Sequence, residues 1–166
     1  KNLGELEKLL TSIYSRSEHT GLKISIKTRI GYESIEEFED ILSLYTKFPL
    51  EKLIIHPRTR MEFYKGGVHK ESFAKAFEKY DEINEAHRLC FNGELSDMGD
   101  IKELNEEFPN INHLMIGRGL LRYPFLAENI CKVESMDRNK RLKNYLTELF
   151  SAYLEEFNGG SAAVLK

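Results

Sequence analysis

The amino-acid sequence predicts an α/β protein built on a parallel sheet, and three observations support this prediction. Short apolar segments rich in β-branched residues alternate along the chain with segments whose apolar residues recur at helical spacing. Glycine, proline or asparagine follows each short apolar segment, as expected where a strand ends. The pattern occurs four times, and strand–helix alternation of this kind is typical of parallel α/β sheets.

The first strand–helix unit follows an opening helix. The apolar residues of Leu3–Tyr14 fall on one helical face, which predicts an amphipathic helix. Lys23–Ile30 alternates strictly between polar and apolar residues, which predicts a strand that ends at Gly31. Ser34 and Glu37 have the spacing of a capping box, and we expect them to begin the next helix.

Three further units follow the same plan. They are Leu53–Ile55 with Phe73–Tyr80, Leu89–Phe91 with Met98–Phe108, and His113–Ile116 with a helix that begins near Pro124. We expect Pro57 to end the first of these strands, and Pro124 to lie in the first turn of the last helix. Met136–Phe157 predicts a longer amphipathic helix appended to the sheet.

Four strand–helix units amount to half of a TIM-type (β/α)8 barrel. A complete barrel needs about 250 residues, whereas this chain has 166. We place the half-barrel in residues 1–130, and the start of a helical region with a flexible tail from Asn158 in residues 131–166. The chain opens at Lys1 within a helical pattern, so we expect a piece of a longer protein. A small doubly wound sheet is the alternative that four strands could also build.

Composition limits the classes of function. The chain is 41% hydrophobic and 31% charged, which suits one globular domain with an apolar core, and no apolar run is long enough for a membrane span. Cys90 and Cys131 form neither a disulfide framework nor a zinc pattern, so we expect two buried structural cysteines and no metal site. In the absence of a targeting segment we expect a cytoplasmic protein. The net charge of −3 excludes a global nucleic-acid signature, so any RNA binding would depend on local patches.

Each predicted strand has polar residues or glycines at its carboxyl end. In chain order they are Lys27 and Arg29, then His56 and Arg58, then Asn92, Gly93 and Glu94, and finally Gly117, Arg118 and Gly119. In (β/α)8 barrels the active site lies at this face, and phosphate is commonly bound after the last two strands. Glycines let backbone N–H groups approach an anion, and an adjacent arginine adds charge-assisted donors. A phosphorylated ligand is therefore the first hypothesis.

These strand ends form motifs with a characteristic order and spacing. The motifs are Ile26–Gly31, Ile55–Arg60 with Tyr64–Gly66, Phe91–Glu94, and Met115–Gly119 with Pro124 and Phe125. Together they resemble strands five to eight of the tRNA-dihydrouridine synthase family, and the resemblance covers Lys23 to about Ile130. The sequence departs from the family pattern at Glu94, where the family has aspartate.

The resemblance implies an FMN cofactor. It implies that Lys27 contacts the pyrimidine edge of the flavin, where an ammonium stabilises the negative charge of reduced flavin. His56 would lie near the isoalloxazine ring or the phosphate. The remaining implied cofactor residues, around the ribityl chain and phosphate, are Asn92, Gly93, Glu94, Gly117, Arg118 and Gly119.

The resemblance also implies a reaction, which is reduction of the C5–C6 double bond of uridine in tRNA, with NADPH re-reducing the flavin. The family's proton-donating cysteine belongs to the N-terminal half of its barrel. Neither Cys90 nor Cys131 matches that position. We therefore expect no catalytic residue in this chain, and no activity from the chain alone.

Two local basic patches are candidates for tRNA contact. Arg58, Arg60 and Lys65 lie in a loop that also contains aromatic residues, and positive charge with interleaved aromatics suits RNA. The alternative is a solvated loop with salt bridges to Glu62 and Glu71. The second patch has five basic residues between positions 132 and 143.

Two other classes of function remain open from the sequence. Another phosphate-binding TIM-barrel enzyme, either a different flavin oxidoreductase or an aldolase with Lys27 as its Schiff-base lysine, would also fit glycine-rich strand ends. A non-catalytic half-barrel would expose two strand edges, and such edges favour self-association.

Overall fold

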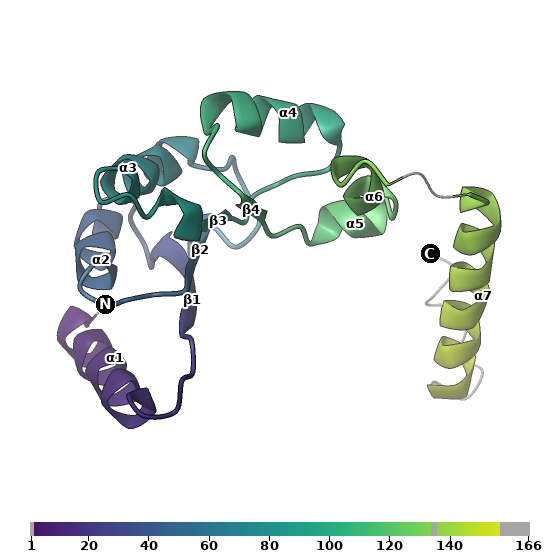
Figure 1. Cartoon of the computed structure of the whole chain (residues 1–166). Coiled ribbons are helices and arrows are strands. Elements are labelled where there is room, and N and C mark those ends of the chain that lie inside the picture. The colour runs from purple at the N-terminus through teal and green to yellow at the C-terminus, as the bar shows by residue number, and fades with distance from the viewer. Residues whose placement is uncertain (1, 134–135, 157–166) are drawn as a thin grey trace.

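The computed structural model describes residues 2–133 and 136–156 and contains one four-stranded parallel sheet (Figure 1). The strands are β1 (Ser25–Gly31), β2 (Lys52–Thr59), β3 (Leu89–Phe91) and β4 (His113–Leu114). The helices are α1 (Leu3–Ser17), α2 (Glu37–Tyr45), α3 (Lys70–Asp81), the 3₁₀ helix η1 (Ala86–Arg88), α4 (Met98–Glu107), α5 (Arg118–Arg122), α6 (Leu126–Ile130) and α7 (Arg138–Glu156). The tail predicted from Asn158 lies outside the described residues.

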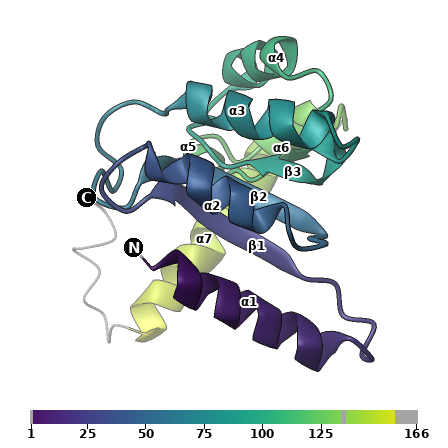
Figure 2. The same ribbon diagram turned by 90° about the vertical axis from the view of Figure 1, so that its left-hand side faces the viewer.

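Strand order distinguishes a half-barrel from a doubly wound sheet. The order is β1-β2-β3-β4, with every neighbouring pair parallel. Helices α2, α3 and α4 lie along one side of the sheet (Figures 1 and 2). A doubly wound sheet would reverse its strand order and place helices on both faces. The prediction of half of a TIM-type barrel, followed by a helical segment, is therefore confirmed.

One apolar cluster joins the sheet to these helices. Its fully buried members include Ile55 of β2, Phe91 of β3 and Phe73 of α3. The Phe73 ring meets the rings of Phe91 and Phe108 edge-on, with centroids 5.0 and 5.2 Å away. Such edge-to-face pairs add to the stabilisation gained from burial. The core therefore lies between the strands and their outer helices, and it supports the strand end at Phe91.

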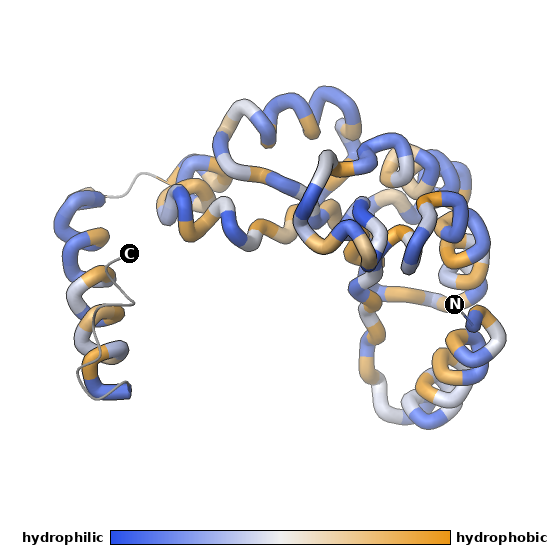
Figure 3. The backbone as a smooth tube through the Cα atoms, turned by 180° about the vertical axis from the view of Figure 1, so that it is seen from behind, coloured by the Kyte–Doolittle hydropathy of each residue, from blue (hydrophilic) through white to orange (hydrophobic). Residues whose placement is uncertain are grey.

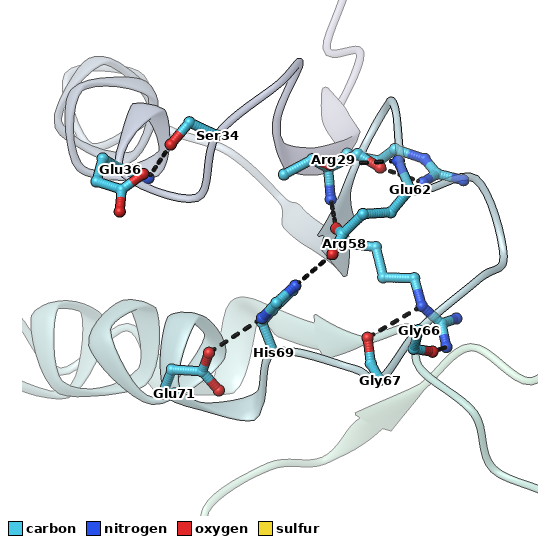
Figure 4. Close-up of polar contacts among 10 residues, drawn as sticks. Arg29, Ser34, Glu36, Arg58, Glu62, Gly66, Gly67, His69 and Glu71 are labelled. Atoms are coloured by element: carbon cyan, nitrogen blue, oxygen red, sulfur yellow. Dashed lines mark hydrogen bonds and ion pairs between the residues drawn. The ribbon is translucent and has the colours of Figure 1, made fainter.

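The start of α2 differs in detail from a capping box. The Glu37 carboxylate accepts backbone N–H groups of Tyr32, Glu33 and Ser34 at 2.8–3.1 Å, and these bonds lower the pKa of Glu37. The Ser34 hydroxyl accepts the N–H of Glu36 (Figure 4). Ser34 and Glu37 do interact as predicted, but the helix begins at Glu37, so Ser34 lies outside it.

Strand β2 continues through Pro57 to Thr59, so the prediction that the proline ends this strand is wrong. The register against β1 shifts between Arg29 and Gly31, and this irregularity accommodates a residue that has no N–H to donate. The Pro57 carbonyl accepts the N–H of His69 at 2.9 Å. Because β2 extends to Thr59, His56 and Arg58 lie within the strand.

The last unit is also built differently from the prediction. Strand β4 ends at Leu114 rather than Ile116, and α5 begins directly at Arg118, where no helix was predicted. Pro124 precedes Phe125, the N-cap of α6, and so lies just before the helix rather than inside its first turn.

The two cysteines have different environments. Cys90 is buried in β3, and burial raises the pKa of its thiol. Cys131 is exposed at the C-cap of α6, so the expectation of burial is wrong for it. Its position at the end of the last barrel helix leaves it beyond the core. Among the described residues, no helix has the length and apolar character needed to cross a membrane.

Helix α7 extends away from the sheet and has no buried residue in its described part (Figure 1). Figure 3 shows apolar and polar residues alternating around it, as its amphipathic pattern predicts. Near its start, Arg138 donates to the Asn129 side chain at 2.7 Å, and Arg141 forms an ion pair with Glu128. Both guanidinium groups also lie over the Phe125 ring.

Candidate functional site

Parallel pairing brings the polar strand ends to one edge of the sheet. Arg29 is opposite His56 in the β1–β2 register, and Ile55 is opposite Phe91 in the β2–β3 register. Phe91 is in turn opposite Leu114. The predicted residues lie within β1 and β2 and after β3 and β4, and the parallel register brings them toward the carboxyl edge of the half-barrel.

The edge is strongly cationic around His56, which is only 8% exposed. Burial, followed in order of effect by the nearby charges of Arg29, Lys27, Arg58 and Arg118, lowers the pKa of His56 from 6.5 to about 4. Burial also lowers the pKa of Lys27, and the charge of Arg29 adds to this effect. His56 is therefore neutral at neutral pH, and the positive potential around it favours an anion.

A cavity of about 220 Å³ lies at the ends of β3 and β4. Its lining residues are Gly93, Glu94, Leu95, Ser96, Gly117, Arg118, Gly119 and Arg122. The predicted site omitted Leu95, Ser96 and Arg122. Arg122 follows Arg118 by one helical turn and lines the same cavity, but this signal depends on α5, which was not predicted.

The three glycines of this cavity have different roles. A Cβ on Gly93 would lie 2.4 Å from the Phe91 ring, and one on Gly119 would lie 1.9 Å from the Leu95 carbonyl oxygen. A Cβ on Gly117 would meet no atom within 4 Å. Gly93 and Gly119 are therefore required by close packing, whereas Gly117 faces open space beside the cavity.

Asn92 joins the end of β3 to β2 and to the segment after β4. Its backbone N–H donates to the Ile55 carbonyl at 2.9 Å, and its side-chain amide donates to the Met115 carbonyl at 2.8 Å. These bonds hold the end of β3 between β2 and the segment after β4. The side-chain N–H is thus used within the protein, and the cofactor contact of Asn92 stays a prediction.

Arg58, predicted as a tRNA contact, is internal and only 1% exposed. Its Nε and Nη2 donate to the carbonyls of Gly67 and Gly66 at 3.2 and 2.7 Å (Figure 4). Its Nη1 is buried and has no hydrogen-bond partner within the described ranges. The loop folds back over this guanidinium, so Arg58 is covered by the protein itself, whereas Arg60 and Lys65 are exposed.

Tyr64 lies at the centre of the loop after β2, and the predicted site omitted it. Its ring centroid is 4.6 Å from the Arg118 guanidinium carbon, 5.6 Å from that of Arg29 and 6.1 Å from the His56 ring. The ring is nevertheless largely exposed, since Tyr64 has 61% relative accessibility. An aromatic residue within a basic loop was the available signal, but only the fold places it over the cationic edge.

His69 holds the end of the same loop. Its Nε2 lies 2.6 Å from a Glu62 oxygen, and its Nδ1 lies 3.1 Å from a Glu71 oxygen (Figure 4). The second Glu62 oxygen accepts the N–H of Thr59 at 2.6 Å. The carboxylates considered as partners for the basic loop residues therefore pair with His69, while Lys70 pairs with Glu103.

This arrangement predicts a pH-dependent contribution to stability. Hydrogen bonding to Glu62 raises the pKa of His69 above 6.5, and hydrogen bonding to His69 lowers the pKa of Glu62 from 4.5 to about 2. The histidine contribution is complete below pH 6.5 and is lost as the pH rises through the folded-state pKa. The glutamate contribution is present above pH 4.5 and is lost as the pH falls toward 2.

We therefore expect the pair to stabilise most between about pH 4.5 and 6.5, by about 1 kcal/mol or less, because both side chains are partly exposed. The measurement is the melting temperature from pH 4 to 9 for the unmodified chain and His69→Gln. The variant should lose stability chiefly in that window. Replacement of the exposed His19 by glutamine is the control, and parallel profiles for all three proteins would contradict the assignment.

The residues described contain no group of three or more His, Cys, Asp or Glu side chains placed to hold a metal ion. The fold and the cationic strand ends define the chain as part of a (β/α)8-barrel protein. The model of the dihydrouridine synthase (Dus) family matches residues 4–158, and the chain belongs to this family.

Curated relatives agree with this assignment. The chain is 32% identical over 136 residues to the probable tRNA-dihydrouridine synthase 2 of Bacillus subtilis (strain 168), a match that covers 82% of this chain and 42% of that protein. It is 33% identical over 138 residues to the probable tRNA-dihydrouridine synthase of Staphylococcus aureus (strain Mu50 / ATCC 700699), covering 83% and 40%. The chain thus spans about two fifths of the length of these relatives.

Proposed function

We propose that the chain is the cofactor-binding half of an FMN-dependent tRNA-dihydrouridine synthase. The parent enzyme is an oxidoreductase that reduces the C5–C6 bond of uridine in tRNA, with NADPH as reductant. One observation supports the cofactor in particular: the cationic group around His56 lies at the same sheet edge as a cavity lined by glycine and arginine. The names of the relatives support the reaction.

The residues present fit a phosphorylated flavin. Gly117 leaves open space where its Cβ would stand, so its backbone can approach a phosphate. Arg118 and Arg122 supply charge-assisted donors to the same cavity. Lys27 supplies a positive charge for the flavin ring, and FMN, when bound, supplies hydride transfer.

In this proposal, side chains of the chain bind and orient the flavin ring. Burial and Arg29 lower the pKa of Lys27, and an anionic ring beside it would oppose that shift and favour the charged ammonium. His56 holds one ring proton at neutral pH because its pKa is about 4, so it can donate one hydrogen bond and accept another.

The proposal assigns no proton donor to this chain. Cys90 is buried with a raised pKa, and Cys131 lies at the end of α6. The chain alone is therefore proposed to be inactive. On the tRNA side, the proposal retains the exposed Arg60 and Lys65, the start of a helical tRNA-binding region in residues 131–166, and a cytoplasmic location.

The test is flavin binding by the purified chain, measured by quenching of FMN fluorescence. We expect Lys27→Met to weaken binding by roughly tenfold to a hundredfold, as loss of a charged hydrogen bond does. Lys102→Met, at a lysine on the exposed face of α4, is the matched control and should bind as the unmodified chain does. Absence of FMN binding, or equal binding by both variants, would contradict the proposal.

A non-catalytic, self-associating half-barrel is the second candidate. It is favoured by the sheet order, in which β1 and β4 are the outer strands and each has one edge without a described strand neighbour. A colourless dimer on a sizing column would support it. Borohydride trapping of a carbonyl substrate on Lys27 would instead support an aldolase.

A further inference from the structure

The Glu94 carboxylate connects two arginines from different parts of the site. One of its oxygens lies 2.7 Å from Arg118 Nη2, and the other lies 3.3 Å from Arg58 Nη2. Glu94 follows β3, Arg58 is in β2, and Arg118 begins α5. One half-exposed side chain therefore links the ends of three barrel units.

Both arginines reach the loop of residues 60–68. Arg58 holds the carbonyls of Gly66 and Gly67 near the end of this loop. Arg118 lies against the ring of Tyr64, with its guanidinium carbon 4.6 Å from the ring centroid, where a cation–π contact is favourable. The loop is thus held at two places by cations that share the Glu94 carboxylate.

The same carboxylate also faces the cavity. Glu94 and Arg118 are both lining residues, so an anion that enters competes with Glu94 for the Arg118 guanidinium. Arg58 is buried and keeps its bonds to the loop, whereas Arg118 is 60% exposed in its side chain and can change partner. Ligand binding in the cavity can therefore affect Tyr64 through the Arg118 guanidinium, which contacts both Glu94 and the Tyr64 ring.

We propose that Glu94 is a positioning residue that couples occupancy of the cavity by a phosphate group to the conformation of the loop of residues 60–68. The coupling to a ligand rests on the proposed function, because that function places a phosphate in the cavity. The role of Glu94 in positioning the loop without ligand does not depend on the proposed function. Glu94 acts through Arg58 and Arg118 and takes no part in the chemistry.

The first experiment measures hydrogen exchange of the loop amides without ligand. Glu94→Gln keeps the size of the side chain but removes its charge, and exchange in the loop should become roughly fivefold faster. Glu106→Gln, on the exposed face of α4, should leave the loop within twofold of the unmodified chain. Arg118→Gln removes the ion-pair partner of Glu94 and should also make exchange of the loop amides faster. Equal loop exchange in Glu94→Gln and Glu106→Gln would overturn the proposal.

The second experiment adds inorganic phosphate, and then FMN, at constant ionic strength set with chloride. Each ligand should change loop exchange in the unmodified chain. In Glu94→Gln, measured at the ligand concentration that gives the same fractional saturation, this change should be small or absent. If Glu94 had a purely structural role, the ligand would change loop exchange equally in both proteins. That result would overturn the proposed coupling.

The two experiments separate this inference from the proposed function. If neither ligand binds but Glu94→Gln still loosens the loop, the proposed function fails and the positioning role stands. If FMN binds and loop exchange is equal in both proteins, the proposed function stands and the inference fails.

Discussion

Replacing Gly119 by alanine is expected to lower the free energy of unfolding by about 3 kcal/mol, the upper part of the range for overpacking. The added Cβ would lie 1.9 Å from the Leu95 carbonyl oxygen, and 3.2 Å from the Ile116 side chain. A backbone oxygen cannot turn away as a side chain can, so α5 or the segment after β3 must shift. The better helix propensity of alanine offsets at most about 1 kcal/mol of this cost.

Gly117→Ala is the matched control, because nothing lies within 4 Å of its Cβ position. It should change stability by less than about 0.5 kcal/mol. Urea unfolding followed by circular dichroism measures both variants. Equal midpoints for the two would show that Gly119 is not required by packing.

Replacing Phe73 by alanine is expected to cost about 3–5 kcal/mol, as for other fully buried phenylalanines. Phe73 is completely buried and packs edge-on against Phe91 and Phe108. Since a whole domain is stable by only about 5–15 kcal/mol, this loss should lower the melting temperature sharply. It should also loosen the strand end that precedes Asn92.

The control is Phe63→Ala, since Phe63 is exposed in the loop after β2. It removes the same side chain and should change stability by less than about 0.5 kcal/mol. Thermal unfolding followed by circular dichroism compares the two. If Phe73→Ala melts within a few degrees of Phe63→Ala, the sheet and α3 are not joined by the core described.

The order and type of the main helices and strands can be predicted from the sequence, because the spacing of apolar residues and the order of the segments can be read from a single sequence. Lys27, His56 and the Asn92–Gly93 turn were placed at one sheet edge for that reason. The sequence was insufficient at Pro57, where a register shift in the neighbouring strand lets β2 continue. Strand β4 was predicted two residues too long, because helix α5 starts where only a turn was expected.

Side-chain environment was harder to predict than position. Arg58 and Arg60 are neighbours in one basic segment, yet one is buried and the other exposed. The difference depends on carbonyls of Gly66 and Gly67 and on Glu94, which is distant in the sequence. Composition and periodicity contain no record of such long-range partners.

The contacts at the start of α7 have a consequence for how this helix is attached. Glu128 pairs with Arg138 and Arg141, and no described residue of α7 is buried. Ion pairs at partly exposed sites weaken as dissolved salt screens them, whereas apolar burial does not. Added salt is therefore expected to weaken these ion pairs between α6 and α7 more than it weakens the buried core of the sheet.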